Sequence, residues 1–282
     1  MSIPHFDLGG SGAPLHFLHA NGYPPDCYKP FLECLQPHFH VFGMHLRPLW
    51  PDAKPKELHD WHPLADDLLR FLSDREAGPV IGVGHSIGGI VTLRAAFREP
   101  NRFRALVLID PVLLPPCFIL FWNLIRATGM GRKVLPKIPG ALSRRRYFDD
   151  LDLVFRGYRQ RKVFRYLSDE NLYTYIEGIA RPLPDGGYDL IYSPEWEAHI
   201  YYTGIWHDLD LWRGLKQLHV PTLFIRGSES DTFWARTAAR VRRANPQVRM
   251  EAIAKAGHLV PLEHPQEVAD LILEFFDGVA QD

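Results

Sequence analysis

Apolar residues form short continuous runs along the chain, and these runs alternate with segments of helical periodicity. The runs lie at residues 14–19, 40–46, 79–84, 105–110, 220–227 and 247–253. Apolar side chains at helical spacing lie at residues 64–72, 87–97, 236–244 and 265–276. Runs without polar alternation are typical of strands buried on both faces, and strands separated by helices indicate a parallel sheet. The pattern therefore predicts an α/β fold with a mostly parallel central sheet flanked by helices.

The alternation stops in the middle of the chain. From about Pro111 to Leu209 the sequence is rich in aromatic residues, arginines and prolines and has no obvious strand. We therefore expect residues 1–111 and 209–282 to form the core and residues 112–208 to form a mainly helical insertion. Basic residues cluster in the insertion, at Arg144, Arg145, Arg146, Arg156, Arg159, Arg161, Lys162 and Arg165. Such runs are typical of solvated helix faces with local ion pairs, and attraction to an anionic substrate or surface is the alternative.

Composition excludes several classes of function. The 282 residues carry 32 Lys and Arg against 33 Asp and Glu, a formal net charge of -1. This balance gives no overall field to collect nucleic acid. The cysteine count is odd and small, with Cys27, Cys34 and Cys117. A disulfide framework is therefore disfavoured, and the simplest expectation is a protein of the reducing cytoplasm.

Neither the start of the chain nor its longest apolar stretch predicts a membrane or export signal. The first seven residues have no basic region followed by an apolar one, so they do not read as a signal peptide. Residues 112–125 are apolar but contain Pro115 and Pro116. The stretch is shorter than the roughly 20 residues that a membrane span needs. We expect a buried element or an amphipathic lid here, and contact with a membrane is disfavoured.

The strongest chemical signal is the segment 84–89, which reads GHSIGG and has the form G-x-S-x-G. An apolar run precedes it and a helical pattern follows. At such a sharp corner between strand and helix the serine is strained and its hydroxyl is exposed, while flanking side chains would collide. Gly84 and Gly88 meet that requirement, so Ser86 is the candidate nucleophile. A glycine-rich turn with a capping serine is the structural alternative.

A serine hydroxyl stays protonated at neutral pH, so it needs a base, and the base needs an orienting carboxylate. His258 is the preferred base because it lies between the last strand and the last helix, and His264 is the fallback. Asp231, in the loop after the strand 220–227, is the preferred acid, with Glu229 as a competitor. Asp110, at the end of the strand 105–110, remains open as the second choice, and it could equally cap a turn.

The reaction also needs donors for an oxyanion. The backbone N–H of Ile87, directly after the nucleophile, is one candidate, and the N–H of Asn21 in the loop 19–22 is the second. Asn21-Gly22 is also a strong turn former on its own. Other motifs are weak. The pairs His38/His40 and His59/His62 lack convincing partners for a metal, and no nucleotide-binding motif follows a strand, so we expect no metal and no cofactor.

Together these residues resemble the α/β-hydrolase superfamily, in its branch of serine esterases, lipases and C–C hydrolases with a helical cap. The resemblance rests on the elbow 84–89, the oxyanion loop 19–22, the acid loop 227–231 and the base at 257–258. It implies an α/β-hydrolase fold in which residues 112–208 form the cap or lid. Ser86 differs from the aspartate of dehalogenases and epoxide hydrolases. Two segments depart from the family: His19-Ala20 replaces the common His-Gly, and residues 45–51 replace an Asp-x-Arg-Gly-x-Gly turn.

The resulting hypothesis is a serine hydrolase that cleaves a small-molecule carboxylic ester through an acyl-enzyme, as a carboxylesterase or lipase-like enzyme. The aromatic residues of the insertion favour an apolar or aromatic acyl group. Two alternatives remain. The same residues could cleave a C–C bond in a diketone-type substrate. The fold could also serve as a ligand-binding, receptor-like protein with slow turnover.

Overall fold

The computed structural model describes residues 2–279, apart from the side chains of residues 132 and 133. Seven strands form one sheet in the order β1-β3-β2-β4-β5-β9-β10. The strands are β1 (His5–Gly9), β2 (Ala13–Leu18), β3 (Phe39–Met44), β4 (Val80–His85), β5 (Phe103–Ile109), β9 (Thr222–Gly227) and β10 (Arg249–Ile253). All neighbours are parallel except β1, which pairs antiparallel with β3. The α/β fold with a mostly parallel sheet is confirmed.

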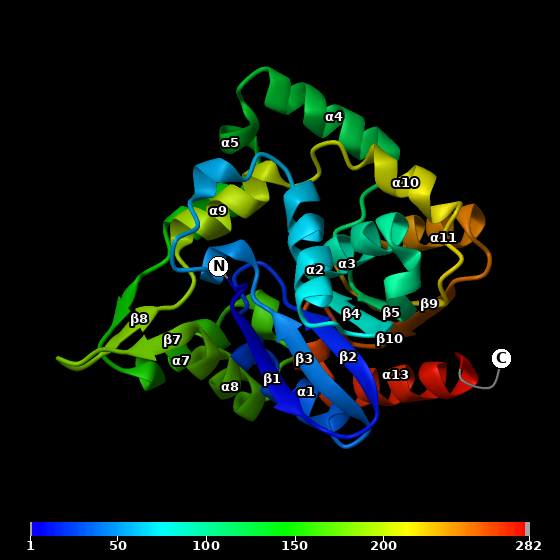
Figure 1. Ribbon diagram of the computed structural model, residues 1–282. Helices are drawn as coiled ribbons and strands as arrows, with labels where there is room; N and C mark the ends of the chain where they lie inside the picture. Colours follow the sequence, from blue (N-terminus) through cyan, green and yellow to red (C-terminus); the bar gives the residue numbers. More distant parts are fainter. Residues whose placement is uncertain (1, 280–282) are drawn as a thin grey trace.

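Helices cover both faces of the sheet (Figure 1). They are α1 (Lys29–Leu35), α2 (His62–Asp74), α3 (Ile87–Arg98), α11 (Ala235–Ala244), α12 (Val260–Glu263) and α13 (Pro265–Val279). Short 3-10 helices connect the elements, namely η1 (Pro25–Tyr28), η2 (Arg47–Leu49), η3 (Pro55–Glu57), η4 (Pro100–Arg102) and η5 (Lys162–Phe164). The four helices expected from periodicity are α2, α3, α11 and α13.

Two hydrophobic cores lie on opposite faces of the sheet. In β5, Ala105, Val107 and Ile109 pack into the core formed with α1 and α13. Leu106 and Leu108 pack into the other core, with α2, α3 and α11. Successive side chains of a strand point to opposite faces, so a strand buried on both sides must be apolar throughout. This explains the continuous apolar runs of the sequence.

The segment between β5 and β9 adds a layer outside the sheet (Figure 1). Its elements are α4 (Pro116–Ala127), α5 (Gly131–Val134), α6 (Lys137–Leu142), β6 (Tyr147–Phe148), α7 (Leu151–Arg159), α8 (Asp169–Ile179), β7 (Ala180–Pro182), β8 (Tyr188–Leu190), α9 (Pro194–Thr203) and α10 (Leu209–Leu215). The expectation of no strand here was wrong, because β6, β8 and β7 form a small antiparallel sheet. The division of the chain into a core and a cap stays a prediction.

A buried ion pair fixes the point where the inserted segment returns to the core. Arg94 of α3 donates to Asp208 at 2.7 Å and to Asp210 at 3.0 Å. The side chains of Arg94 and Asp208 are only 2% and 3% exposed. His62 Nε2, at the start of α2, lies 2.7 Å from Asp210. Removal of one partner of such a buried pair leaves an uncompensated charge, so these contacts tie the start of α10 to α2 and α3.

None of the described helices is long and apolar enough to cross a membrane. The apolar stretch at 112–125 instead leads into α4, whose residues Ile119 and Trp122 are buried while Leu120, Phe121 and Leu124 are exposed. The stretch is therefore partly buried and partly exposed.

Candidate active site

Ser86 occupies a sharp corner between β4 and α3. Its backbone has φ 57 and ψ -117, a region that residues other than glycine rarely adopt. The N–H of Ser86 donates to the carbonyl of Ile109 at the end of β5, 2.9 Å away. That contact fixes the corner at the carboxyl edge of the sheet. Strain of this kind persists only where the surroundings impose it, and it is common at functional residues.

The glycines on either side allow this corner to form. A Cβ on Gly84 would lie 2.4 Å from the carbonyl oxygen of Gly88, and one on Gly88 would lie 2.1 Å from the carbonyl oxygen of Leu18. No side chain fits at such distances. The sequence therefore has glycine at both positions because the start of α3 passes directly over the end of β4 and against β2.

His258 lies between Ser86 and a buried carboxylate. It follows β10 and precedes α12, so the last strand brings it to the edge where β4 ends. His258 Nε2 is 3.0 Å from Ser86 Oγ, and His258 Nδ1 is 2.8 Å from Asp110 Oδ1. A carboxylate oxygen accepts, so Nδ1 carries the ring proton and Nε2 accepts the hydrogen bond of the serine hydroxyl.

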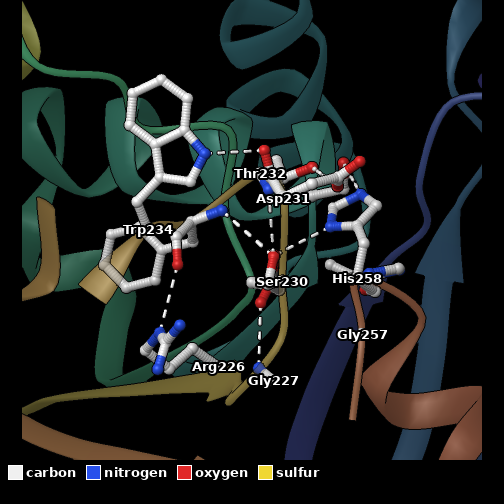
Figure 2. A network of polar contacts seen from close by, with 12 residues as sticks. Arg226, Gly227, Ser230, Asp231, Thr232, Trp234, Gly257 and His258 are labelled. Carbon is white, nitrogen blue, oxygen red and sulfur yellow. Dashed lines mark hydrogen bonds and ion pairs between the residues drawn. The ribbon is translucent and has the colours of Figure 1, made fainter. Parts of the chain in front are cut away.

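Asp110 is fully buried at the end of β5 and has φ 41, a region that aspartate tolerates better than most residues. The hydroxyl of Ser230 donates to its Oδ1 at 2.6 Å, and the N–H of Gly227 donates to its Oδ2 at 3.0 Å. Figure 2 shows Gly227, Ser230 and His258 in this network. These donors satisfy a carboxylate that would otherwise be costly to bury.

The structure corrects the choice of acid, because Asp231 makes no hydrogen bond to His258 in the described part of the chain. Its carboxylate accepts from the hydroxyl of Thr232 at 3.1 Å, and both residues are labelled in Figure 2. Asp231 also lines the cavity above the site. The loop after β9 instead places Ser230 against Asp110. Burial opposes ionisation of Asp231, but the charges of Lys137 and His258 outweigh it and lower its pKa. Asp110, the second choice from the sequence, is the carboxylate beside the histidine.

The other candidates for acid and base lie elsewhere. Glu229 pairs with Arg165 at 3.0 Å and accepts from the hydroxyl of Tyr166 at 2.6 Å. His264 Nε2 lies 3.1 Å from the carbonyl oxygen of Lys255, and no hydrogen bond joins it to Ser86 among the described residues. Glu229 and His264 therefore stabilise loops and are not part of the site around Ser86.

The two expected oxyanion donors border the same cavity as Ser86. The N–H of Ile87 is the first of α3, and a helix leaves its first N–H groups without an intrahelical acceptor. The Asn21 side chain is held at both ends, since its Nδ2 donates to the carbonyl of Glu197 at 3.1 Å and its Oδ1 accepts from Tyr192 at 2.8 Å. The main chain of Asn21 is thereby fixed beside the cavity. The role of both N–H groups stays a prediction.

A buried chain of hydrogen bonds, not expected from the sequence, joins the two loops on either side of Ser86. His85 Nε2 donates to the carbonyl of His258 at 2.8 Å, because a carbonyl only accepts. His85 Nδ1 must then accept from the hydroxyl of Tyr28, 2.8 Å away, and that hydroxyl accepts from the N–H of Ala20 at 3.1 Å. Burial lowers the pKa of His85 well below its ordinary value, which keeps the ring neutral as this pattern requires. The chain links the loop of Asn21 to the backbone of His258.

The carboxylate of Glu263 also supports the loop of His258, because it accepts from the N–H of Gly257 at 2.6 Å. Burial raises the pKa of Glu263 from 4.5 to about 7, although the Gly257 hydrogen bond opposes the shift. A carboxyl with a raised folded pKa binds more protons in the folded state, so stability is lost as pH rises between the two values.

We expect the free energy of unfolding to fall as pH rises from about 4.5 to about 7, and Glu263→Gln to remove this component. The variant gains up to about 3 kcal/mol relative to wild type above pH 7. Urea unfolding of both proteins at a series of pH values measures this. Parallel pH curves for wild type and variant would contradict the assignment.

A cavity of about 450 Å³ lies above Ser86 between the core and the inserted segment. Its wall consists of two groups. The apolar group includes Trp61, Leu114, Phe118, Trp122, Ile205 and Trp234. The polar group includes Tyr23, Arg144, Tyr158, Arg161, Tyr175 and Glu197. Within residues 2–279, no group of three or more His, Cys, Asp or Glu side chains could hold a metal ion.

Comparisons with known proteins identify the family. Residues 17–271 match the model of the Alpha/beta hydrolase family. The chain is 24% identical to a pimeloyl-[acyl-carrier protein] methyl ester esterase of Legionella pneumophila (strain Corby), over 96% of this chain and 98% of that protein. It is 26% identical to a soluble epoxide hydrolase of Corynebacterium sp. (strain C12), over 96% and 93%.

Among solved structures, E-2-(acetamidomethylene)succinate hydrolase superposes with a TM-score of 0.77 at 22% identity, over 97% of this chain and 94% of that one. This similarity shows the fold alone. The family match spans most of the chain, and the similar proteins are hydrolases that include esterases. The chain belongs to the alpha/beta hydrolase family.

Proposed function

We propose that the protein is a serine hydrolase that cleaves a carboxylic ester of a small molecule. The observation that carries the proposal is the continuous contact from Ser86 Oγ to His258 Nε2, at 3.0 Å, and from His258 Nδ1 to Asp110, at 2.8 Å. A nucleophile, a base and an orienting carboxylate within hydrogen-bond reach form the arrangement that activates serine for acyl transfer.

In the proposed reaction Ser86 Oγ attacks the carbonyl carbon while its proton passes to His258 Nε2. Asp110 keeps the proton on Nδ1 and stabilises the imidazolium that forms. The N–H groups of Ile87 and Asn21 donate to the oxyanion. The imidazolium returns its proton to the leaving alcohol, which gives an acyl-enzyme. Water then attacks with His258 as base, and the acid product and free Ser86 are released.

The cavity supports a substrate with an apolar part. The rings of Trp61, Trp122 and Trp234 line it together with aliphatic side chains, and such walls favour an apolar or aromatic group. We propose that residues 112–208 act as a cap, because α4 and α6–α9 contribute many of the lining residues. The three cysteines are free, which supports a reducing compartment such as the cytoplasm.

The names of the relatives support ester cleavage, since one of them is a methyl ester esterase. One observation favours a second candidate. Arg144 and Arg161 line the cavity, and cationic side chains there could stabilise the enolate that forms when a C–C bond of a diketone is cleaved. The same serine and histidine would serve both reactions, so only the substrate distinguishes them.

Turnover of a substrate panel tests the proposal. We expect hydrolysis of p-nitrophenyl esters, with kcat/KM rising and then falling as the acyl chain outgrows a cavity of about 450 Å³. A vinylogous diketone serves as the comparison. Cleavage of the diketone with no turnover of any ester would favour the second candidate. No turnover of either class would contradict the proposal and favour a ligand-binding role.

A further inference from the structure

One end of the cavity places two arginines among phenol rings. Arg144 and Arg161 both come from the inserted segment and both line the cavity. The guanidinium of Arg161 lies 4.3 Å from the centre of the Tyr158 ring. Tyr158 in turn lies 6.0 Å from Tyr175, measured between ring centres. This group of Arg144, Tyr158, Arg161 and Tyr175 is called the basic end of the cavity below.

The charges on the cavity wall do not cancel at this end. Arg144 is paired with Glu197. Lys137 and Asp231 also line the cavity, and the charge of Lys137 contributes to the lowered pKa of that carboxyl. Arg161 has no carboxylate within ion-pair distance among the residues that the structure describes. One positive charge is therefore left without a protein counter-charge, and because Arg161 is exposed, water screens part of its field.

The basic end also offers hydrogen-bond donors without protein partners. Tyr158 and Tyr175 are 6% and 3% exposed, line the cavity, and make no side-chain hydrogen bond to any described residue. Arg144 uses only Nη1 toward Glu197, so its other guanidinium N–H groups are free to donate. Buried polar groups are nearly always hydrogen-bonded, which indicates that these face a polar ligand or water.

The basic end is open on its far side. Arg144, Tyr158 and Arg161 also line a second hollow of about 460 Å³ between α6 and α7. Of the acidic residues of that hollow, Asp149 pairs with Arg145 at 3.1 Å, and Asp150 accepts from an N–H at the start of α7. Because Arg161 is exposed and lines this second hollow, a charged group at the basic end can keep part of its hydration.

We propose that the basic end binds the free carboxylate of a substrate that is a half-ester of a dicarboxylic acid. Planar guanidinium groups match the geometry of a carboxylate, and one negative charge balances the one that Arg161 leaves uncompensated. The proposal rests on ester hydrolysis at Ser86 and adds to it the second functional group of the substrate. The apolar wall then contacts the chain between the two carbonyl carbons.

The test compares p-nitrophenyl half-esters of adipic and suberic acid with neutral p-nitrophenyl esters of the same acyl length. The readout is the ratio of kcat/KM for the half-ester to kcat/KM for the neutral ester. We expect wild type to favour the half-ester by roughly 10- to 100-fold, the size of a charged hydrogen bond. Arg161→Gln should lose most of that preference, chiefly through KM, and Arg161→Lys should recover part of it.

Arg156→Gln is the matched control, because Arg156 lies on α7, is exposed, and lines neither hollow. It should keep the wild-type ratio. The double variant Arg144→Gln/Glu197→Gln removes the neighbouring pair without a lone buried charge, and it should lower the ratio. An unchanged ratio in Arg161→Gln, or no preference in wild type, would overturn the proposal.

A binding measurement separates this proposal from the catalytic one. Monomethyl adipate should raise the melting temperature of the Ser86→Ala protein, which cannot turn it over, and should not raise that of Ser86→Ala/Arg161→Gln. Binding without hydrolysis by wild type would keep the carboxylate site and reject the esterase. Hydrolysis of neutral esters without binding of the acid would keep the esterase and reject the carboxylate site.

Discussion

Replacement of Ser86 by alanine is expected to lower kcat for every ester by at least about 10⁴-fold, to the level that the remaining site supports. The reason is that the hydroxyl supplies the nucleophile, which hydrogen-bonds to His258 Nε2 at 3.0 Å. Loss of that hydroxyl removes the acyl-enzyme route altogether. The comparison of steady-state rates for wild type and variant measures the effect.

Stability should change little, because the strained corner is set by backbone contacts and by Gly84 and Gly88. Ser228→Ala is a suitable control, since Ser228 is exposed and lies outside the cavity. It should keep the wild-type rate. An active Ser86→Ala protein would reject the role of Ser86, whereas an unfolded one would be recognised by its melting curve.

The second large effect is expected for Asp110→Asn, which should lower kcat by about 10⁴-fold with little change in KM. An asparagine amide can donate to His258 Nδ1, and the ring then carries its proton on Nε2. In that tautomer the histidine cannot accept the proton of Ser86. The pH profile should shift as well, because the carboxylate no longer stabilises the imidazolium.

Asp231→Asn is the matched control for this variant. Asp231 faces the cavity and influences His258 only through charge across it, so its loss should change kcat by no more than about tenfold. The pair of variants therefore decides which carboxylate serves the histidine. A larger loss for Asp231→Asn than for Asp110→Asn would contradict the assignment to Asp110.

Local patterns predicted the mostly parallel sheet, its flanking helices and the sharp turn at Ser86, because such features are encoded over short stretches. The apolar runs reflect burial on both faces, and Gly84 and Gly88 reflect a single close approach. The edge strand β1 was missed because His5–Gly9 is short and largely exposed. The small sheet of β6, β7 and β8 was missed because its strands have only two or three residues.

The acid could not be chosen from the sequence, because β5 and β9 end at the same edge and each is followed by an aspartate. The choice depends on which loop turns inward. The backbone at Asp110 turns its carboxylate toward His258, while the loop after β9 presents Ser230. The sequence offered one weak signal in favour of Asp110. Asp110 directly follows a buried strand, whereas Asp231 lies further along the loop after β9.

The support for the histidine loop was also missed. His85 is the last residue of an otherwise apolar strand and directly precedes Ser86. A buried histidine at this position must find hydrogen-bond partners. That requirement was readable, but the identity of its partners, Tyr28 and the carbonyl of His258, depends on contacts between distant segments. The same holds for Arg161, which faces the cavity although it belongs to a run of surface arginines.

Labelling with a fluorophosphonate tests the central claim most directly, because the reagent reacts with a serine only when a base activates it. The predicted result is one label per chain, mapped by peptide mass spectrometry to Ser86, and no label on the Ser86→Ala protein. Asp110→Asn should label far more slowly than wild type, and Asp231→Asn should label at a similar rate. A folded wild-type protein that takes no label, or takes it at another residue, would contradict the account.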